Sequence, residues 1–367
     1  MGIVLRPFVD LPIVASAPAP APAHLAATAA RVDARIQALL NSEIARWSAV
    51  NPQLMAPLRS LQALVMAGGK RLRPAFCYWA FVGAGGQPED PLVIDAGAGL
   101  ELLHTFALVH DDVMDGSATR RGMDAVHVQF INTHEAAQRR GEARRFGEGV
   151  AILVGDLAFV YADLLLVGAP RSAIDIFPEL RVEVNIGQYL DLVGTATGNP
   201  TLEAARQIGV YKSGKYTVER PLHLGAALAG QFERHDTALT RFGIPLGEAF
   251  QLRDDLLGAL GDDGLTGKPV GDDLREGKPT ALLAHALASC TANQAEILGT
   301  VGDPELDDDR VRAIQEVLRA TGAEGIVERQ ISTLRDDSIA AIESSALSRP
   351  AINALVELAF FVTDRNH

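Results

Sequence analysis

Carboxylates end one apolar segment of the chain, in the run LVHDDVMDG at residues 108–116. Residues four apart share a face of a helix, so Asp111 and Asp115 would project together. Their repulsion costs stability, and a divalent cation would offset that cost. Carboxylate oxygens suit Mg²⁺, which also takes phosphate ligands from a substrate. A solvated acidic helix end explains the short motif about as well, but the apolar run before it, at residues 102–109, favours the mouth of a cavity.

A second carboxylate pair, Asp254 and Asp255, ends another apolar segment. It is followed by Lys268 and by the run GDDLREGK, which ends at Lys278, so both lysines lie on Gly-rich turns. Alternating acids and bases fit a metal–diphosphate complex, with Mg²⁺ on the carboxylates and phosphate oxygens on the lysines. Taken alone, this segment is better explained as a polar surface loop.

Basic residues form three further clusters. The run GGKRLRP at residues 68–74 places cations at an expected helix N-terminus, where they oppose the macrodipole unless an anion binds there. The run TRRG at residues 119–122 carries two arginines whose planar forks match phosphate oxygens, although they could also compensate the neighbouring aspartates. Lys212 and Ser213 lie in a segment that Pro221 should kink, unless the gap in its hydrogen bonds is used.

The segments that must position these motifs have helical periodicity. Few runs alternate apolar and polar residues as strands do, which predicts an all-α fold. The clearest breaks in the pattern are short, so we predict one helical domain over residues 25–367, interrupted near residues 83–91, 194–200, 261–271 and 301–309. Residues 1–24 are rich in Ala and Pro, which predicts a flexible tail.

The composition argues against several classes of protein. The 367 residues carry a formal net charge of −13, which argues against nucleic-acid binding. Cys77 and Cys290 have no metal-ligand spacing, which favours a reducing compartment without disulfides. Two apolar stretches, 92–109 and 150–169, approach the length of a membrane span, but each contains carboxylates that are costly in lipid. We therefore expect buried core helices, no membrane span and a cytoplasmic protein.

Taken together, the motifs resemble those of the trans-isoprenyl diphosphate synthase, or polyprenyl synthetase, family. The runs that carry the resemblance occur in the order GGKRLRP, ELLHTFALVHDDVMD, RRG and GKPVGDDLREGK. The resemblance implies an orthogonal bundle of roughly ten or more helices around a central apolar cavity, usually as a homodimer. It also implies a Mg²⁺-dependent head-to-tail condensation of isopentenyl diphosphate with an allylic diphosphate (dimethylallyl, geranyl or farnesyl).

The resemblance assigns metal and isopentenyl diphosphate sites to individual residues. Asp111 and Asp115 would bind two of about three Mg²⁺ ions, with Asp112 in support. Asp254, followed by Asp255, would bind the third. The isopentenyl diphosphate site would comprise Lys70, Arg73, His104 and Arg121.

The allylic site is implied in the same way. The allylic diphosphate would contact Arg120, Lys212, Gln251 and Lys268. Ser213 would supply the hydroxyl that a threonine usually supplies, and Lys278 would shield the diphosphate from further away. Gln188 and Asp191 would line the cavity opposite the first aspartate motif.

One position departs from the family pattern. The second acidic motif usually closes with an aspartate four residues after its first, and that position is Gly258 here. Because Asp254, Asp255 and Asp273 remain, we still expect an active enzyme.

The residues just before the first acidic motif concern product length. Phe106 is an aromatic residue five positions before Asp111, and the small Ala107 lies four positions before it. This combination resembles geranylgeranyl diphosphate synthases. This predicts mainly a C20 product, with C15 farnesyl diphosphate as the alternative. A Phe106 that only packs in the core is a second interpretation of that residue.

Two other functions would account for part of this pattern. A class I terpene cyclase also uses an aspartate-rich helix and Mg²⁺, but it has no need of a second diphosphate site such as residues 68–74 with Arg121. A non-catalytic subunit of a heteromeric synthase usually lacks aspartates or the basic loop, whereas this chain loses only the aspartate expected at position 258.

Overall fold

The computed structural model describes residues 21–198, 200–261, 271–303 and 305–364, and these ranges are almost wholly helical. In chain order the helices are α1 (Ala23–Ser48), the 3₁₀ helix η1 (Pro52–Leu54), α2 (Met55–Met66), α3 (Leu72–Gly83), α4 (Pro91–Asp115), α5 (Val126–Ala136), α6 (Ala143–Leu164), α7 (Arg171–Thr197), α8 (Leu202–Ile208), the π-helix η2 (Gly209–Glu219), α9 (Arg220–Leu228), α10 (Phe232–Leu260), α12 (Asp272–Glu276), α13 (Ala281–Ser289), α14 (Ala292–Leu298), α15 (Asp308–Ala320), α16 (Ala323–Glu343) and α17 (Arg349–Thr363). The strands β1 (Thr119–Arg120) and β2 (Met123–Asp124) form a small antiparallel hairpin. The predicted all-α fold is confirmed.

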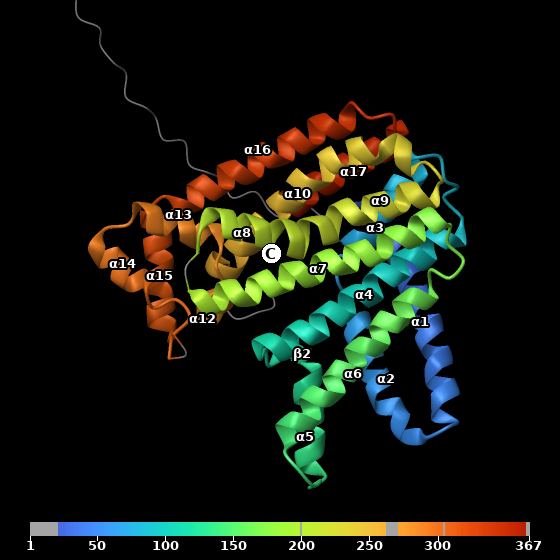
Figure 1. Ribbon diagram of the computed structural model, residues 1–367, viewed down its shortest axis with the longest axis horizontal. Coiled ribbons are helices and arrows are strands. Elements are labelled where there is room, and N and C mark those ends of the chain that lie inside the picture. Colours follow the sequence, from blue (N-terminus) through green and yellow to red (C-terminus); the bar gives the residue numbers. More distant parts are fainter. Residues whose placement is uncertain (1–20, 199, 262–270, 304, 365–367) are drawn as a thin grey trace, which may run out of the picture.

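Helix α4 carries the first acidic motif and packs against α1, α3 and α6 (Figure 1). Its N-terminus is capped by the side chain of Asp90, which accepts a hydrogen bond from the backbone N–H of Leu92 at 2.9 Å. It ends at Gly116, whose φ of 69° suits a residue without a β-carbon. Among the described residues, α4 is the one helix long and apolar enough to cross a membrane, and 67% of its apolar window is buried in the bundle.

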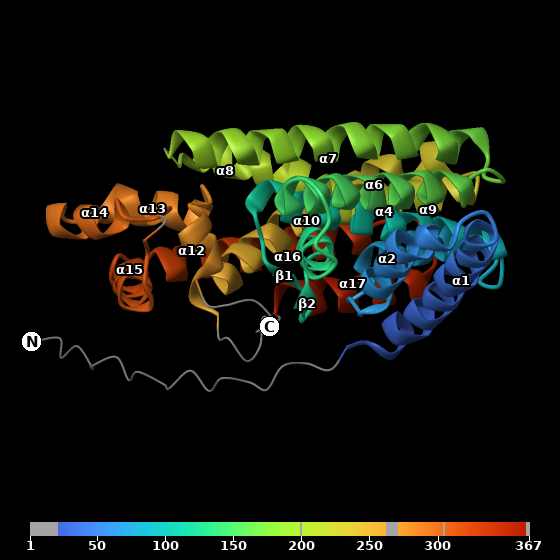
Figure 2. The same cartoon turned by 90° about the horizontal axis from the view of Figure 1, so that it is seen from below.

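The helices lie in layers, which Figure 2 shows from the side. Helix α7 runs along one face with α6 beneath it, and α17 lies on the opposite side. Helices α10 and α16 pack together along the bundle, and α13, α14 and α15 extend beyond it at one end (Figure 1). That end has its own apolar core, which includes Leu282, Ile314 and Val327.

The predicted disturbance at Pro221 takes the form of a π-helix. Residues 209–219 form η2, and Pro221 then lies in the first turn of α9. η2 packs against α7 on one side and α10 on the other. Short π-helical segments are frequent at functional sites, and this one carries Lys212 and Ser213.

The helical region begins slightly earlier than the predicted boundary. α1 begins at Ala23, so its first two residues lie in the predicted tail. The Nδ1 atom of His24 accepts a hydrogen bond from the indole N–H of Trp79 at 2.8 Å, and its Nε2 atom lies 3.3 Å from the carboxylate of Glu357. Most of the predicted tail lies outside the described residues.

Candidate active site

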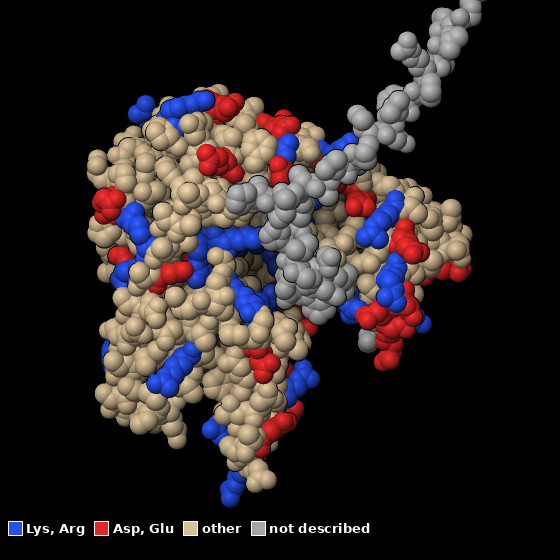
Figure 3. Space-filling view, turned by 180° about the vertical axis from the view of Figure 1, so that it is seen from behind, with Lys and Arg blue, Asp and Glu red and all other residues tan. Residues whose placement is uncertain are grey.

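A hollow surrounded by Lys and Arg side chains opens on one face of the molecule (Figure 3). Two adjoining cavities, of about 620 and 330 Å³, lie among the predicted site residues. The larger cavity contains the carboxylates of both acidic motifs, and the smaller one contains the basic loop of residues 69–73. Residues that line both cavities are Lys70, His104, Leu108, Asp111, Arg121, Lys212, Ser213 and Asp254.

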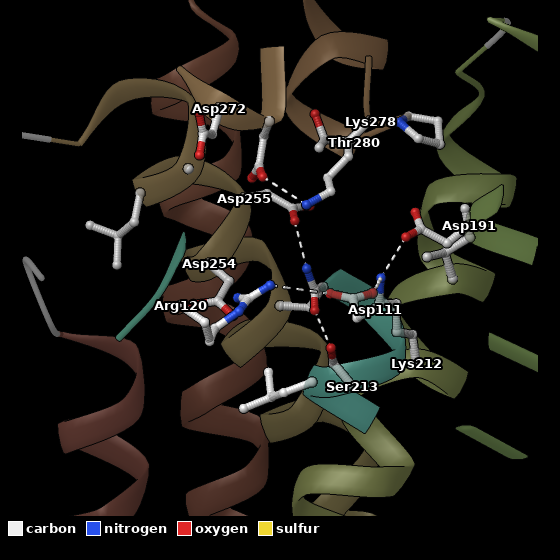
Figure 4. A pocket seen from close by; sticks show the side chains of 18 of the residues that line it. Asp111, Arg120, Asp191, Lys212, Ser213, Asp254, Asp255, Asp272, Lys278 and Thr280 are labelled. Carbon is white, nitrogen blue, oxygen red and sulfur yellow. Dashed lines mark hydrogen bonds and ion pairs between the residues drawn. The ribbon is translucent and has the colours of Figure 1, made fainter. Parts of the chain in front are cut away.

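The first acidic motif contacts a lysine of η2, an arginine of β1 and a neutral amide of α7 (Figure 4). Oδ1 of Asp111 accepts a hydrogen bond from Nε2 of Gln188 at 2.9 Å and lies 3.4 Å from Nζ of Lys212. Arg120 lies 3.7 Å from Asp111 and donates from Nε to the buried Asp112 at 2.8 Å. Asp115 lies one turn further along α4, half-buried, and lines neither cavity.

Asp111 and Asp115 are electrostatically coupled. Burial raises the pKa of Asp111, but Lys212, Lys278 and Arg120 outweigh it, so that the pKa is lowered overall. Burial, and then the charge of Asp111, raise the pKa of Asp115 to about 6. The predicted repulsion between carboxylates four residues apart is therefore present, and a bound cation would relieve it.

Lys212 projects from η2 towards the carboxylates. Its Nζ atom lies 2.5 Å from Oδ2 of Asp191 on α7. Burial lowers the pKa of Lys212, but the charges of Asp111 and Asp191 outweigh burial, so the pKa is raised above its ordinary value. Lys212 is therefore charged. Gly187 allows the approach of the two helices, because a β-carbon there would collide with the Lys212 backbone.

A buried ion cluster joins η2 to α7 and α9. Glu183 accepts hydrogen bonds at 2.6 Å from Lys215 and, through both of its oxygens, from Arg220. Lys215 also lies 3.5 Å from Glu219. Because removing one member of such a cluster leaves a buried charge without compensation, the cluster fixes η2 against α7.

The second acidic motif is joined to η2 through Gln251. The Gln251 amide donates to Oδ1 of Asp255 at 2.6 Å and accepts from the hydroxyl of Ser213. Burial raises the pKa of Asp255 to about 8, with Asp273 and Asp254 adding to the effect. Asp254 also lines both cavities.

Lys278 lies beside the second motif (Figure 4) and pairs with Asp273 at 3.0 Å and Glu276 at 2.6 Å. Burial lowers the pKa of Lys278, but these two carboxylates raise it well above its ordinary value. Lys278 is therefore charged, and its side chain lines the larger cavity. Lys268, predicted to contact the allylic diphosphate, lies outside the described residues.

The basic loop and the β1–β2 hairpin bring Lys70, Arg73 and Arg121 to the smaller cavity. Arg73 donates to the hydroxyl of Thr217 at 2.8 Å, and its guanidinium lies 4.3 Å from the ring centre of Tyr216. Arg121 donates to the carbonyl of Leu64 at 3.0 Å. These contacts orient each guanidinium, and within the described part of the chain neither one forms an ion pair with a carboxylate, so both can bind an anion.

Residues with a left-handed backbone conformation set the directions of the basic side chains. Arg121 and Gly122 have φ values of 54° and 74° at the centre of the hairpin, as a two-residue type I′ turn requires. Arg71, with φ 50°, is the N-cap of α3, and its side chain is buried. It pairs with Asp33 at 2.8 Å and Glu101 at 2.7 Å, so it supports the loop from beneath.

His104 lies where both cavities meet. Burial, and then the charges of Arg73 and the other arginines nearby, lower its pKa well below the ordinary value. The ring is therefore neutral, and it can donate or accept a hydrogen bond without adding charge.

The two residues predicted to control product length lie differently. Ala107 lines the smaller cavity together with Val184. Phe106 lines neither cavity. The centre of its ring lies 5.0 Å from the ring centre of Phe159 on α6 and 4.6 Å from that of His110. These are contacts of a packed aromatic, so a role of Phe106 in product length stays a prediction.

The donor set suits a hard divalent cation that also binds substrate. Within the described ranges, no three His, Cys, Asp or Glu side chains converge into a ready-made metal site. Mg²⁺ is commonly held by one or two carboxylates and completed by substrate phosphates. Asp111 with Asp115, and Asp254 on α10 across the larger cavity, fit that arrangement.

Some supporting residues could not be identified from the sequence. Thr217 is distant in sequence from Arg73, and no local pattern predicts their hydrogen bond. Glu183 likewise meets Arg220 only in the folded chain. Glu101 did carry a signal, because a carboxylate inside the apolar run of α4 needs a buried partner, which is Arg71.

Comparisons with known proteins agree with this geometry. The family model described as polyprenyl synthetase matches residues 56–318. The chain is 31% identical over 329 residues to the short chain isoprenyl diphosphate synthase of Methanothermobacter thermautotrophicus, covering 87% of this chain and 93% of that protein. It is 32% identical over 301 residues to the geranylgeranyl diphosphate synthase of Mycobacterium tuberculosis, covering 80% and 79%.

A solved structure is also similar over most of its length. It is the geranylgeranyl pyrophosphate synthase of Corynebacterium glutamicum, complexed with isoprenyl diphosphate and magnesium. The two chains superpose with a TM-score of 0.87 at 36% identity, over 91% of this chain and 97% of the other.

Proposed function

This chain belongs to the polyprenyl synthetase family and is a prenyltransferase, and from that premise we propose the substrates, metal and product of its reaction. It condenses isopentenyl diphosphate head-to-tail with dimethylallyl, geranyl or farnesyl diphosphate, in the cytoplasm, and its main product is C20 geranylgeranyl diphosphate. The observation that supports this proposal is the pair of adjoining cavities: Asp111 and Asp254 lie where the two meet, the larger one extends to Asp255 and Lys278, and the smaller one extends to Arg73 of the basic loop.

The larger cavity receives the allylic diphosphate. About three Mg²⁺ ions held by Asp111, Asp115 and Asp254 supply charge neutralisation for the leaving diphosphate. Arg120 and Lys212 bind its oxygens, and Lys278 adds positive charge from the opposite wall. The cations aim at the position where negative charge develops as the carbon–oxygen bond breaks, so they stabilise the transition state.

The smaller cavity receives isopentenyl diphosphate. Lys70, Arg73 and Arg121 bind the diphosphate, and the neutral His104 hydrogen-bonds to it. This holds the double bond beside the allylic carbon, which converts the encounter into an intramolecular step. The new carbon–carbon bond forms as the allylic cation is attacked, and the released pyrophosphate takes the proton. Substrates that fill both cavities would displace water, which would otherwise quench the cation.

The product length follows from the small side chain of Ala107 at the wall of the smaller cavity. Because the two cavities adjoin, the tail of the allylic substrate can extend from the larger cavity past Ala107 along α4, which favours C20. C15 is the alternative, since Val184 narrows the smaller cavity from α7.

We also propose that the chain is a homodimer, with its interface on α6 and α7. Apolar side chains are exposed along both helices, among them Leu153 at 61%, Val160 at 52% and Val182 at 53%. An apolar groove of about 600 Å³ lies between Phe159 and Tyr189 on the same face. A contiguous apolar surface of this kind commonly marks a protein–protein interface, and a second copy of the chain can cover it by two-fold symmetry.

Incubation with labelled isopentenyl diphosphate tests the proposal. Each allylic starter is supplied in turn, with and without Mg²⁺, and the products are separated by chromatography. We expect Mg²⁺-dependent extension to a C20 diphosphate. A hydrocarbon formed from geranylgeranyl diphosphate alone would indicate a cyclase instead. No product under any condition would indicate a non-catalytic subunit.

A further inference from the structure

Arg73, in the first turn of α3, is held in two ways by the second half of η2. Its Nη2 atom donates a hydrogen bond to the hydroxyl of Thr217 at 2.8 Å. Its guanidinium also lies over the ring of Tyr216, 4.3 Å from the ring centre. Within the described part of the chain, the buried Nε atom of Arg73 has no hydrogen-bond partner. One part of the guanidinium is therefore fixed by η2, while another part can bind an anion in the smaller cavity.

The hydroxyl of Thr217 has a fixed position because η2 is packed closely against its neighbours. A β-carbon at Gly247 of α10 would lie 2.3 Å from Cα of Gly214. A β-carbon at Gly243 of the same helix would lie 2.8 Å from Cα of Glu219. Helix α7 packs on the other side of η2. Since the backbones meet this closely both before and after Thr217, its hydroxyl can move little relative to the bundle.

The π-helical form of η2 lets one element serve both cavities. Lys212 lines both cavities, and Thr217, which holds Arg73, follows it by five residues. In a π-helix the hydrogen bonds join residues five apart, as that from the Arg220 N–H to the Lys215 carbonyl does at the end of η2. Residues five apart then lie about one turn apart. In an α-helix the same five residues span about 1.4 turns, which would turn Thr217 away from the side on which Lys212 projects.

We propose that Thr217 is a positioning residue of the isopentenyl diphosphate site: its hydroxyl sets the direction of the Arg73 guanidinium, so that the remaining N–H groups face the diphosphate. This inference rests on the proposed function, because that function places isopentenyl diphosphate in the smaller cavity. Thr217 itself lines neither cavity, so it acts through Arg73 and not on the substrate.

The polar atom of Thr217, rather than its shape, is what the site uses. The side chain is 1% exposed, and a buried hydroxyl is costly unless it forms a hydrogen bond. Valine is branched in the same way and would avoid that cost, but it would leave Arg73 held only by the ring of Tyr216. A guanidinium stacked on a ring can still rotate in its own plane, so the hydroxyl is the contact that selects one direction.

The test combines direct binding with a double-mutant cycle on the full-length chain. Isothermal titration calorimetry without Mg²⁺ or allylic substrate measures the Kd for isopentenyl diphosphate, and steady-state kinetics measure the KM for each substrate. The variants are Thr217→Val, Thr217→Ser, Arg73→Ala and Arg73→Ala/Thr217→Val. Thr105→Val is the matched control, because Thr105 is also 1% exposed, lines neither cavity and donates to the carbonyl of Glu101 within its own helix. Thermal melting reports the folding of each variant.

We expect Thr217→Val to raise the Kd and the KM for isopentenyl diphosphate by about 10-fold, the factor that corresponds to loss of a hydrogen bond to a charged group. The KM for the allylic substrate should stay near its wild-type value. Thr217→Ser keeps the hydroxyl and should restore the Kd, and Thr105→Val should not change it. In the Arg73→Ala background, Thr217→Val should have no further effect, since a residue that acts through Arg73 then has nothing to orient.

A Thr217→Val variant that melts like wild type and keeps the wild-type Kd would overturn the proposal. So would an equal loss of affinity when Thr217→Val is added to Arg73→Ala, because the threonine would then act without the arginine. Thr217→Ala, tested in the same two backgrounds, replaces Thr217→Val if that variant does not fold. A wild-type chain that binds isopentenyl diphosphate but makes no prenyl product would refute the proposed function and leave the role of Thr217 intact. A wild-type chain that does not bind isopentenyl diphosphate would overturn both.

Discussion

Charged side chains in the site neutralise one another in ion pairs before any substrate binds. Lys212 pairs with Asp111 and Asp191, and Arg120 with Asp111 and Asp112. A metal–diphosphate complex would exchange these internal pairs for equivalent ones, with carboxylates turning to the metal and cations to phosphate oxygens. So many half-buried charges are tolerable because each has a partner both before and after binding.

Loss of either carboxylate of the first motif should abolish most activity. We expect Asp111→Ala and Asp115→Ala to lower kcat by several orders of magnitude while the far-UV circular dichroism is retained. A catalytic metal contributes several kcal/mol to transition-state stabilisation, and each ~1.4 kcal/mol is a tenfold change in rate. Steady-state kinetics at saturating Mg²⁺ measure the effect. Near-normal kcat in either variant would contradict the metal assignment.

The two diphosphate sites should respond to different substitutions. Lys70→Ala and Arg73→Ala should raise the KM for isopentenyl diphosphate by about 30-fold, because a charge-assisted phosphate contact contributes about 2 kcal/mol. Lys268→Ala should act more on the allylic substrate, since Lys268 follows the second acidic motif in the sequence. KM for each substrate is measured with the other saturating. Equal effects on both substrates would show that the partition is wrong.

The proton on Asp255 should make metal-free stability depend on pH. Its pKa is about 8 in the folded chain, because of burial and the nearby charges of Asp273 and Asp254, against about 3.9 in an unfolded chain. The folded state then retains a proton that the unfolded state releases, so stability falls as pH rises from about 4 to about 8.

Asp255→Asn removes this pH-dependent cost while keeping an oxygen for Gln251. We expect the Tm of the metal-free variant to exceed that of wild type by a few degrees at pH 8, with the difference shrinking towards pH 5. Asp337→Asn on the exposed surface of α16 is the matched control. The same Tm for wild type and Asp255→Asn at pH 8 would be evidence against a protonated Asp255.

Among the elements, α4 and η2 do most to position the chemistry. α4 is rigid because its apolar faces are buried, and it presents His104, Ala107 and Asp111 at successive turns. η2 widens where Lys212 and Ser213 project, and the Glu183 cluster holds it against α7. The reacting groups therefore lie on helices supported by buried contacts, which limits their motion.

Product length is a question about the packing of α4 against its neighbours. Ala107→Phe would place a ring at the wall of the smaller cavity, so we expect shorter products. Phe106→Ala should lengthen the product, and Phe106→Ala/Phe159→Ala should lengthen it more, because the two rings pack edge to face with their centres 5.0 Å apart. Chromatography of the dephosphorylated products measures the length. If none of the three variants changes the product length, Phe106 only packs in the core, and the side chain that limits the growing prenyl tail lies on another helix.

At the scale of the whole molecule, local patterns predicted the elements and the chemistry better than the supporting contacts. The apolar runs of α4 and α6, and the carboxylate spacing in α4, depend on helical periodicity, which a sequence displays directly. The hydrogen bonds from Arg73 to Thr217 and from Arg220 to Glu183 join segments distant in sequence. The folded chain brings these residues together, and no spacing rule anticipates them.

The arrangement of the two outer helices also concerns the whole molecule. Exposed apolar side chains on α6 and α7 form one face, whereas the exposed Val50 lies in the turn between α1 and η1. A charge introduced into a buried interface must be desolvated without a partner, so it should weaken association. The same charge at an isolated exposed position should have little effect.

Leu153→Glu/Val182→Glu should therefore convert a dimer into monomers, while Val50→Glu should not. Val50 is a matched control because it is 69% exposed, comparable with Leu153 at 61% and Val182 at 53%. Light scattering after size exclusion measures the mass, which should be twice the 39.0 kDa of one chain for wild type and Val50→Glu. A retained fold, checked by circular dichroism, separates dissociation from unfolding. If the wild-type chain is a monomer, or if the double variant keeps the wild-type mass, the interface does not lie on α6 and α7.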